Sequence, residues 1–347
     1  MAILHVVDLI ISVILFGVPL FILKIKKHRR IDRNELFLEK YSKFKVHHLL
    51  HVLTGIYFAC TYLAFRYWHT PWYLFSPLHA YALIASLIMP VALAYLTKGT
   101  NKAKHIALVM SVILFLSPLT RPFILAGPFR YLGDGAYRTS FVNFEYAIPL
   151  NICNISALLY LFALLLPKRH TVTGILKNYM ITLGFFGGII NNVQSHNGHV
   201  NFFWYYFNWE SYLVHALIMI IPVFMLLTGQ LNINKKHQLY NLIWLVPTYL
   251  FMGFVLNPWV GFNFWFTAPI DFLAMLPQAH YLTLFGGTVY PIYMTIVFLI
   301  VMFACTLLYS VFKYVEEKMT PFFIDEYISF DLYGDVGDDS DLETAAS

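Results

Sequence analysis

Apolar runs of about 18 to 22 residues recur along the chain, and this is the length that a helix needs to cross a bilayer. Only 12% of the 347 residues are charged, whereas a soluble domain carries about 25%. Inside hydrocarbon, backbone groups must be satisfied within each segment, so apolar runs of this length fold as helices. The chain is therefore predicted to be an all-α, polytopic transmembrane helix bundle.

We expect about nine spans, separated by short polar or basic loops. Their ranges are 4–23, 48–67, 72–96, 105–126, 145–166, 178–193, 209–227, 239–256 and 288–312. Pro and Gly interrupt residues 257–287 too often for a clean span, so this segment is predicted to be re-entrant or interfacial. The first run lacks the basic start and the small-residue cleavage site of a signal peptide, so we expect it to be retained.

Every second loop is basic, and by the positive-inside rule these loops face the cytoplasm. This predicts an N-terminus outside and a C-terminus inside. Residues 1–320 then form the transmembrane domain, and residues 321–347 form an acidic, disordered, cytoplasmic tail that can bind a partner. The formal net charge of +5 comes from the loops, so we expect no nucleic-acid partner.

The fifth apolar run carries a thiol among polar side chains, and such groups need a partner or a use in hydrocarbon. Cys153 lies between Asn151 and Asn154 in this run. If the run is helical from its start, Cys153 lies roughly 12 Å below the membrane surface. Helical spacing also places Cys153, Ser156 and Tyr160 on one stripe.

Further polar residues are expected at a similar depth, in the outer half of the membrane. His215 lies roughly 9 Å deep in the seventh run. At helical spacing, this histidine shares a polar stripe with Asn208, Ser211 and Tyr212. The other polar residues at this level are His79, Arg121, Asn191, Asn192 and Asp271. Ionisable groups at such a depth face the bundle interior or water, so we expect them to line a buried cavity.

A thiol beside an imidazole is an arrangement for nucleophilic acyl transfer, in which the thiolate attacks an acyl carbonyl. Asparagines such as Asn151, Asn154 or Asn191 can donate to the oxyanion, and Arg121 can hold a phosphate. Simpler explanations stay open. A cysteine in a span is often a small core residue, a histidine after a proline can satisfy a freed carbonyl, and Arg121 can extend outward to the interface.

Two further motifs are expected to be structural. His47, His48 and His51 resemble a metal cluster, but they lie beside lysines at a span end without acidic neighbours, so we expect interfacial packing. The pair Gly187 and Gly188 indicates close helix packing. The other two cysteines lie in spans and are expected in the core, so we expect no disulfide framework, metal site or cofactor.

Four segments resemble known motifs and follow one another in the same order as those motifs. Pro149–Asn154 resembles an LPLHLC motif, and 178–188 resembles an ELLYFWG span. Phe207–His215 is similar to an FF-x-x-H segment, and 263–273 resembles an NYLFLRGKP…SLLDLLGP end. These are motifs of the YwaF-like integral membrane proteins of bacteria, which the chain resembles over about residues 144–277.

The resemblance implies an activity and a location. The family includes an animal relative that is a phospholipid acyltransferase, and it looks related to transmembrane fatty-ester hydrolases that use a Thr or Cys with a His. This implies Cys153 as nucleophile and His215 as base, in a bacterial plasma membrane. The chain departs from the pattern at Asn151, where the family often has His, and at Thr267 and Ala268, which replace basic residues.

We therefore expect a membrane-embedded lipid acyltransferase or lipid ester hydrolase, with membrane lipids as partners. Two alternatives stay open. A transporter of a small or lipid-like solute also uses broken segments and intramembrane polar groups, although the polar groups here collect in one half of the bilayer. A non-catalytic scaffold would recruit a cytoplasmic partner through its acidic tail, and deletion of the tail would then remove its function.

Overall fold

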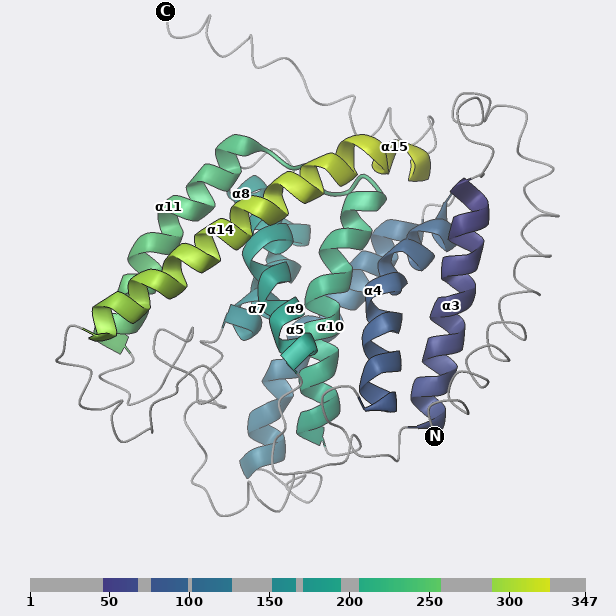
Figure 1. The fold of residues 1–347 in the computed structure, drawn as a ribbon, viewed down its shortest axis with the longest axis horizontal. Helices are drawn as coiled ribbons and strands as arrows, with labels where there is room; N and C mark the ends of the chain where they lie inside the picture. Colours follow the sequence, from purple (N-terminus) through teal and green to yellow (C-terminus); the bar gives the residue numbers. More distant parts are fainter. Residues whose placement is uncertain are drawn as a thin grey trace, which may run out of the picture.

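The computed structural model describes residues 46–67, 76–98, 102–126, 152–166, 171–194, 206–256 and 289–324. Within these ranges the elements are helices, and they pack as a bundle (Figure 1). The predicted all-α, polytopic membrane fold is confirmed by these helices and their apolar lengths. The first predicted span, the 257–287 segment and residues 325–347 of the predicted tail lie outside the described residues. The start of that tail was predicted wrongly, because residues 321–323 belong to a short helix, α15 (Thr320–Phe323), in which Phe323 is buried.

Six described helices are long and apolar enough to cross a membrane. They are α3 (Val46–Arg66), α4 (Pro77–Thr97), α5 (Lys102–Ala126), α10 (Tyr206–Leu227), α11 (Lys235–Phe251) with its extension η5 (Met252–Leu256), and α14 (Val289–Lys318). They correspond to the second, third, fourth, seventh, eighth and ninth predicted spans. The total span count and the orientation in the membrane stay predictions.

The fifth and sixth predicted spans take a different form. The fifth contains α7 (Ile152–Leu165), an apolar helix of 14 residues. The sixth consists of α8 (Thr171–Tyr179), the π-helical turn η4 (Met180–Gly184) and α9 (Phe185–Gln194). α7 packs against α8 and η4. A π-helical turn widens a helix locally, and such turns are frequent at functional sites.

α10 lies at the centre of the bundle (Figure 1). In its apolar window, Glu210–Leu227, 78% of the residues are buried, compared with 11% in the window Thr295–Lys318 of α14. α10 contacts α4, α5, α7, η4 and α9. A helix that is apolar and buried on most sides is typical of a bundle centre. Polar side chains on α10 therefore face other helices more often than lipid.

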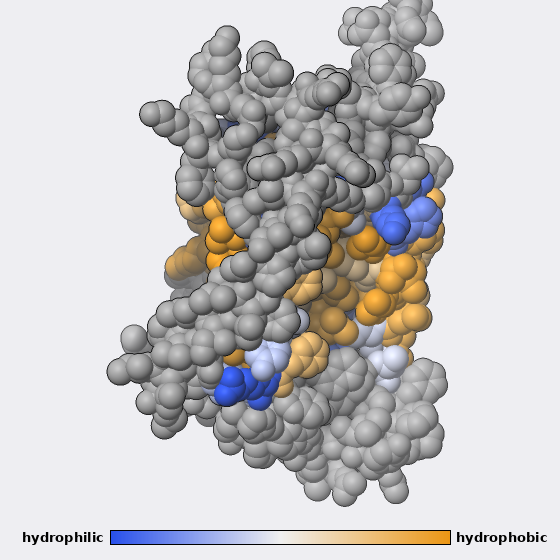
Figure 2. All heavy atoms as spheres, turned by 90° about the vertical axis from the view of Figure 1, so that its right-hand side faces the viewer, coloured by the Kyte–Doolittle hydropathy of each residue, from blue (hydrophilic) through white to orange (hydrophobic). Residues whose placement is uncertain are grey.

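Apolar side chains cover much of the outside of the bundle. Figure 2 shows a band of hydrophobic side chains with hydrophilic ones above and below it. α11 and α14 lie side by side at one edge of the bundle, and α3 lies at the opposite edge (Figure 1). Their exposed side chains include Trp244, Phe251 and Phe303. Lipid tails are as apolar as these side chains, so the band suits a hydrocarbon environment.

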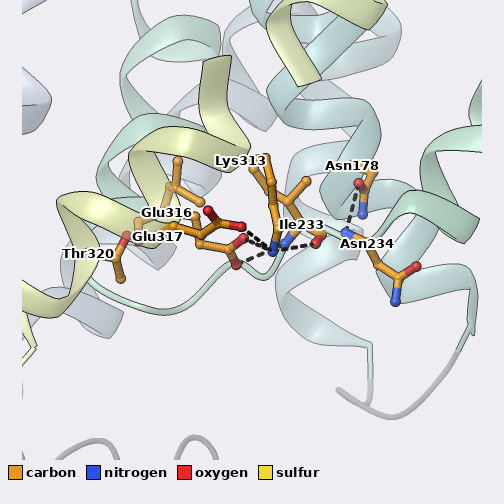
Figure 3. Close-up of polar contacts among 8 residues, drawn as sticks. Asn178, Ile233, Asn234, Lys313, Glu316, Glu317 and Thr320 are labelled. Carbon is orange, nitrogen blue, oxygen red and sulfur yellow. Dashed lines mark hydrogen bonds and ion pairs between the residues drawn. The ribbon is translucent and has the colours of Figure 1, made fainter. Parts of the chain in front are cut away.

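Polar contacts join the loop after α10 to two helices at one end of the bundle, which we call the Lys313 end (Figure 3). The Lys313 Nζ lies 2.8 Å from Glu316 Oε2 on α14. The other oxygen of Glu316 accepts a hydrogen bond from the Ile233 N–H at 3.1 Å. The Asn234 N–H donates to Asn178 Oδ1 of α8 at 3.3 Å. The α10–α11 loop is therefore bound to both α14 and α8.

A buried hydroxyl compensates for a proline inside α10. Pro222 has no N–H, so the carbonyl of Ile218, four residues earlier, lacks its helical hydrogen bond. The Tyr160 hydroxyl of α7 lies 3.0 Å from the Ile218 oxygen and 2.9 Å from the Met180 oxygen in η4. Tyr160 is completely buried. Its one O–H therefore joins α7, η4 and α10 at a single point.

We expect Tyr160→Phe to lower the free energy of unfolding by about 1–3 kcal/mol, because two buried carbonyls lose their side-chain donor. Titration of the purified protein with SDS in detergent micelles measures this change. Tyr314→Phe is a matched control, since that ring is exposed on α14 and should shift stability by no more than about 0.5 kcal/mol. Equal stability of the Tyr160→Phe variant and the wild type would contradict the expectation.

Candidate functional site

Hydrogen bonds between helices collect polar side chains at the end of the bundle where α4, α7 and α10 begin and α5 and α9 end. We call it the Cys153 end. One hydrogen bond joins α4 to α9, one joins α7 to α9, and one joins α5 to α10. Four of the residues predicted from the sequence take part in these bonds, namely His79, Cys153, Asn191 and Asn192.

Cys153 lies in the first turn of α7 with 8% of its surface exposed. The Asn191 side-chain amide donates a hydrogen bond to its Sγ, with the nitrogen 3.4 Å from the sulfur. The same nitrogen lies 3.2 Å from the Gly187 carbonyl oxygen, so its two N–H groups have these two acceptors. Asn191 is thus held by its own helix while it contacts the thiol.

The predicted stripe of Cys153, Ser156 and Tyr160 packs against one neighbouring segment, the helix that runs from α8 through η4 to α9. The Ser156 hydroxyl lies 2.9 Å from the Tyr179 hydroxyl, which extends from the end of α8. Tyr160 contacts Met180, as described above. Helical spacing at positions 153, 156 and 160 thus predicted the packing face of α7 correctly.

The two adjacent glycines of α9 face two neighbouring helices, and at Gly188 the approach is too close for a side chain. A Cβ at Gly187 would lie 3.6 Å from the Cys153 sulfur on α7. A Cβ at Gly188 would lie only 2.9 Å from the His215 carbonyl oxygen on α10. The predicted close packing is confirmed at Gly188. One face of α9 therefore contacts the helix of Cys153, and the adjacent face contacts the helix of His215.

His215 is buried in α10, with 8% of its surface exposed. Its Nδ1 lies 2.6 Å from the carbonyl oxygen of Ser211, one turn earlier. A carbonyl only accepts, so Nδ1 carries the proton and Nε2 is the basic nitrogen of this tautomer. This is the tautomer that a general base requires. The pairing of His215 with Cys153 stays a prediction.

His79 is completely buried near the start of α4. The Ser76 hydroxyl caps this helix, because it accepts a hydrogen bond from the His79 N–H. The ring Nε2 lies 2.8 Å from the carbonyl oxygen of Asn192 and donates to it. The last carbonyls of a helix have no partner within it, so His79 satisfies one of those at the end of α9.

The site also contains a buried acid, Glu210, that was not among the residues predicted from the sequence. Glu210 lies in the first turns of α10 with 1% of its surface exposed, and its Oε1 accepts a hydrogen bond from the Ser117 hydroxyl of α5 at 3.1 Å. Acids inside a membrane bundle are rare and usually functional. The sequence could have pointed to this residue, since Glu210 is the only acid in the apolar run 209–227.

Residues 74–309 match the model of a protein family described as the TMEM164 family, and this range exceeds half of the 347 residues. The chain belongs to the TMEM164 family. No curated protein and no solved structure matches the chain significantly. The TMEM164 match therefore supports a family of membrane proteins, and the YwaF-like name stays a resemblance.

The region shared with the TMEM164 family contains the whole Cys153 end. It begins just before α4 and ends within α14, so it includes every helix that meets there and leaves out α3. The match also extends on both sides of residues 144–277, over which the sequence motifs were recognised. An activity is not part of the match, so the chemistry rests on the site itself.

The remaining predicted site residues lie partly outside the described residues. Asn154 and Asn192 are buried, with 3% and 4% of their surfaces exposed. Arg121 belongs to α5, but its side chain lies outside the described part, as do Asn151 and Asp271 entirely. The roles of these last three residues stay predictions.

The histidine group on α3 is represented by His51, because the side chains of its two neighbours lie outside the described part. His51 is buried and packs edge-on against Tyr95 of α4, with ring centroids 5.3 Å apart. Within the helices that the structure describes, no three His, Cys, Asp or Glu side chains are placed to hold a metal ion. We assign no metal ligand here.

Proposed function

We propose that this membrane protein is a lipid acyltransferase or lipid ester hydrolase with Cys153 as its nucleophile and His215 as its base. The observation that carries the proposal is the hydrogen bond from the Asn191 amide to the buried Cys153 sulfur. This N–H holds the sulfur in a fixed position, and it can donate to a thiolate as well as to a thiol. The thiolate is the nucleophilic form of cysteine.

The position of His215 supports its role as the base. It lies on α10, whose backbone packs against Gly188, and the adjacent face of α9, at Gly187, contacts Cys153. Its Nδ1 is bound to the Ser211 carbonyl, which gives Nε2 the lone pair that a base needs. Burial of both residues excludes bulk water, and this strengthens the electrostatic effects on which acyl transfer depends.

The reaction has two halves. In the first, His215 Nε2 takes the Cys153 proton and the thiolate attacks the ester carbonyl carbon. The carbon–oxygen ester bond then breaks, the leaving alcohol takes the proton from His215, and an acyl thioester remains on Cys153. In the second, a lipid hydroxyl or water attacks the thioester while His215 takes its proton. The thiolate then leaves and regains that proton.

Membrane lipids are the proposed substrates, since a thiol inside a lipid-embedded bundle is accessible to acyl chains before it is accessible to soluble esters. Cys153 lies in the first turn of α7, and its predicted position in the outer half of the membrane would let it reach the ester groups of phospholipids. A bacterial plasma membrane is the location that we propose, because the motifs resemble those of bacterial proteins.

An untargeted lipid profile tests the proposal without a guess about the substrate. Bacterial cells would express the wild type, Cys153→Ala or Cys60→Ala at matched membrane levels. Cys60 is also buried, but it lies on α3 in a separate apolar cluster, so its variant controls for loss of a core thiol. We expect a set of acyl lipids to change with the wild type and with Cys60→Ala, and to revert with Cys153→Ala.

Identical lipid profiles in all three strains, with each protein inserted and folded, would contradict the proposal. That outcome would favour a transporter or a scaffold instead. Uptake of solutes into proteoliposomes would then test transport, and deletion of residues 325–347 would test a scaffold that works through its acidic tail.

A further inference from the structure

The side-chain amide of Asn192 has a hydrogen-bond donor for which the described residues provide no acceptor. Only 4% of Asn192 is exposed, and its Nδ2 has no hydrogen-bond acceptor among the described residues. A buried donor without an acceptor costs about 1–3 kcal/mol, so each such group calls for an explanation. In a site for oxygen-rich lipid esters, an acceptor supplied by the substrate is a direct explanation.

The backbone at Asn192 is fixed, which is what a precise donor requires. The carbonyl oxygen of Asn192 accepts the hydrogen bond from His79 Nε2 at 2.8 Å. His79 is itself fully buried and lies next to the capped start of α4. This bond joins residues that are 113 positions apart in the chain. The end of α9 is thus anchored against α4 rather than left to fray.

Helical spacing places Asn192 near the proposed reaction centre. Gly188 and Asn192 are one turn apart and share a face of α9. Gly188 is the residue whose face contacts the His215 carbonyl. Gly187 and Asn191 share the adjacent face, which contacts Cys153. α9 comes closest to the helix of His215 at Gly188. Asn192 therefore lies one helical turn beyond this point, on the side nearer the membrane surface.

The neighbouring amide is less suited to receive a substrate. The two N–H groups of Asn191 have acceptors in the protein, namely the Cys153 sulfur and the Gly187 carbonyl. A carbonyl oxygen of a substrate would have to displace one of them. Asn192 meets no such competition among the described residues.

We propose that Asn192 donates a hydrogen bond to the ester carbonyl oxygen as it becomes an oxyanion, and that His79 is its positioning residue. This inference rests on the proposed acyl-transfer function and assigns different roles to two adjacent asparagines. Asn191 stabilises the thiolate, and Asn192 stabilises the tetrahedral intermediate. Neither transfers a proton, so the proton balance of the reaction is unchanged.

The experiment measures hydrolysis of 4-methylumbelliferyl oleate by the purified full-length protein in lipid–detergent micelles. Asn192→Leu keeps the approximate size of the side chain and removes its donor. We expect kcat to fall about 10²–10³-fold with little change in KM, as for loss of one oxyanion donor elsewhere. The rate of Cys153 alkylation by a small maleimide should stay at the wild-type value, because Asn191 still contacts the sulfur.

The positioning role is tested by a pair of variants. His79→Leu removes the donor to the Asn192 carbonyl, and we expect kcat to fall by about 10²-fold, the effect of a misplacement of about 1 Å. His79→Gln retains a side-chain N–H and should recover part of that loss. His51→Leu is the matched control, because it removes an equally buried histidine from the opposite end of the bundle and should keep kcat.

Each outcome separates this inference from the proposed function. A Cys153-dependent activity that Asn192→Leu leaves within about threefold of the wild type would overturn only the inference, as would a rise in KM at constant kcat. If the wild type shows neither ester hydrolysis nor an altered lipid profile, the proposed function itself fails. If Asn192→Leu does not fold, Asn192→Ala gives the same comparison with a smaller side chain.

Discussion

Replacement of Cys153 by alanine should remove turnover almost completely, by roughly 10⁴-fold or more, because the proposed mechanism carries the acyl chain on its sulfur. Steady-state hydrolysis of the ester probe gives kcat for this variant. Hydroxylamine-sensitive labelling by a radioactive fatty-acyl ester provides a second measurement, because only a thioester on the protein releases its acyl group under mild hydroxylamine treatment. The wild type should be labelled and Cys153→Ala should not.

Loss of the base should be costly but less complete. We expect His215→Ala to lower kcat by about 10²–10⁴-fold, the usual contribution of general acid–base catalysis. The double variant should be no slower than Cys153→Ala, because each proton transfer by the histidine serves a reaction that takes place at the thiol. Cys60→Ala, which changes a buried thiol on α3, serves as the control and should keep the wild-type rate. Wild-type turnover in both Cys153→Ala and His215→Ala would refute the assignment of these two residues.

A methyl group added at Gly188 should separate α9 from α10. Its Cβ would lie 2.8 Å from Met219 Cγ, which can move, and 2.9 Å from the His215 carbonyl oxygen, which is part of a helix backbone. We expect Gly188→Ala to lower the free energy of unfolding by about 1–3 kcal/mol, the usual effect of overpacking. Its thermal midpoint in detergent, followed by size-exclusion chromatography of heated samples, measures the loss.

The adjacent glycine provides a matched control. A Cβ at Gly187 would meet Ile152 Cγ2 at 3.4 Å and the Cys153 sulfur at 3.6 Å, which are ordinary van der Waals contacts. In addition, alanine favours a helix over glycine by about 1 kcal/mol. Gly187→Ala should therefore fold at least as stably as the wild type. Equal thermal midpoints for the two alanine variants would show that the close approach at Gly188 does not limit stability.

The bundle was predictable because the thickness of hydrocarbon fixes the length of a spanning helix. The π-helical turn η4 was not, since it depends on contacts between segments. Gly184 lies against the Tyr160 hydroxyl, and a Cβ there would collide with it. Pro222 is visible in the sequence, but the residue that compensates for it lies on another helix. No local pattern shows such a partner.

The candidate site likewise contains features that the sequence predicts and contacts between helices that it does not. Helical spacing predicted which face of α7 carries Cys153, and the depth of the spans predicted that polar residues from separate runs would lie at one end. The acceptor of His79 could not be predicted, because it is a backbone carbonyl, which every residue has. Glu210 could have been found by a search for acids within apolar runs, and its hydroxyl partner, Ser117, could not.

The hydrogen bond between His79 and Asn192 also dictates when the protein can be completed during its synthesis. Its two residues are 113 positions apart, and ribosomes add about 5–20 residues per second, so roughly 6 to 23 seconds separate the appearance of the histidine and of its acceptor. During that interval the His79 imidazole on α4 lacks the carbonyl oxygen to which it donates in the finished protein. The Cys153 end can therefore be completed only after α9 has been synthesised and has packed against α4.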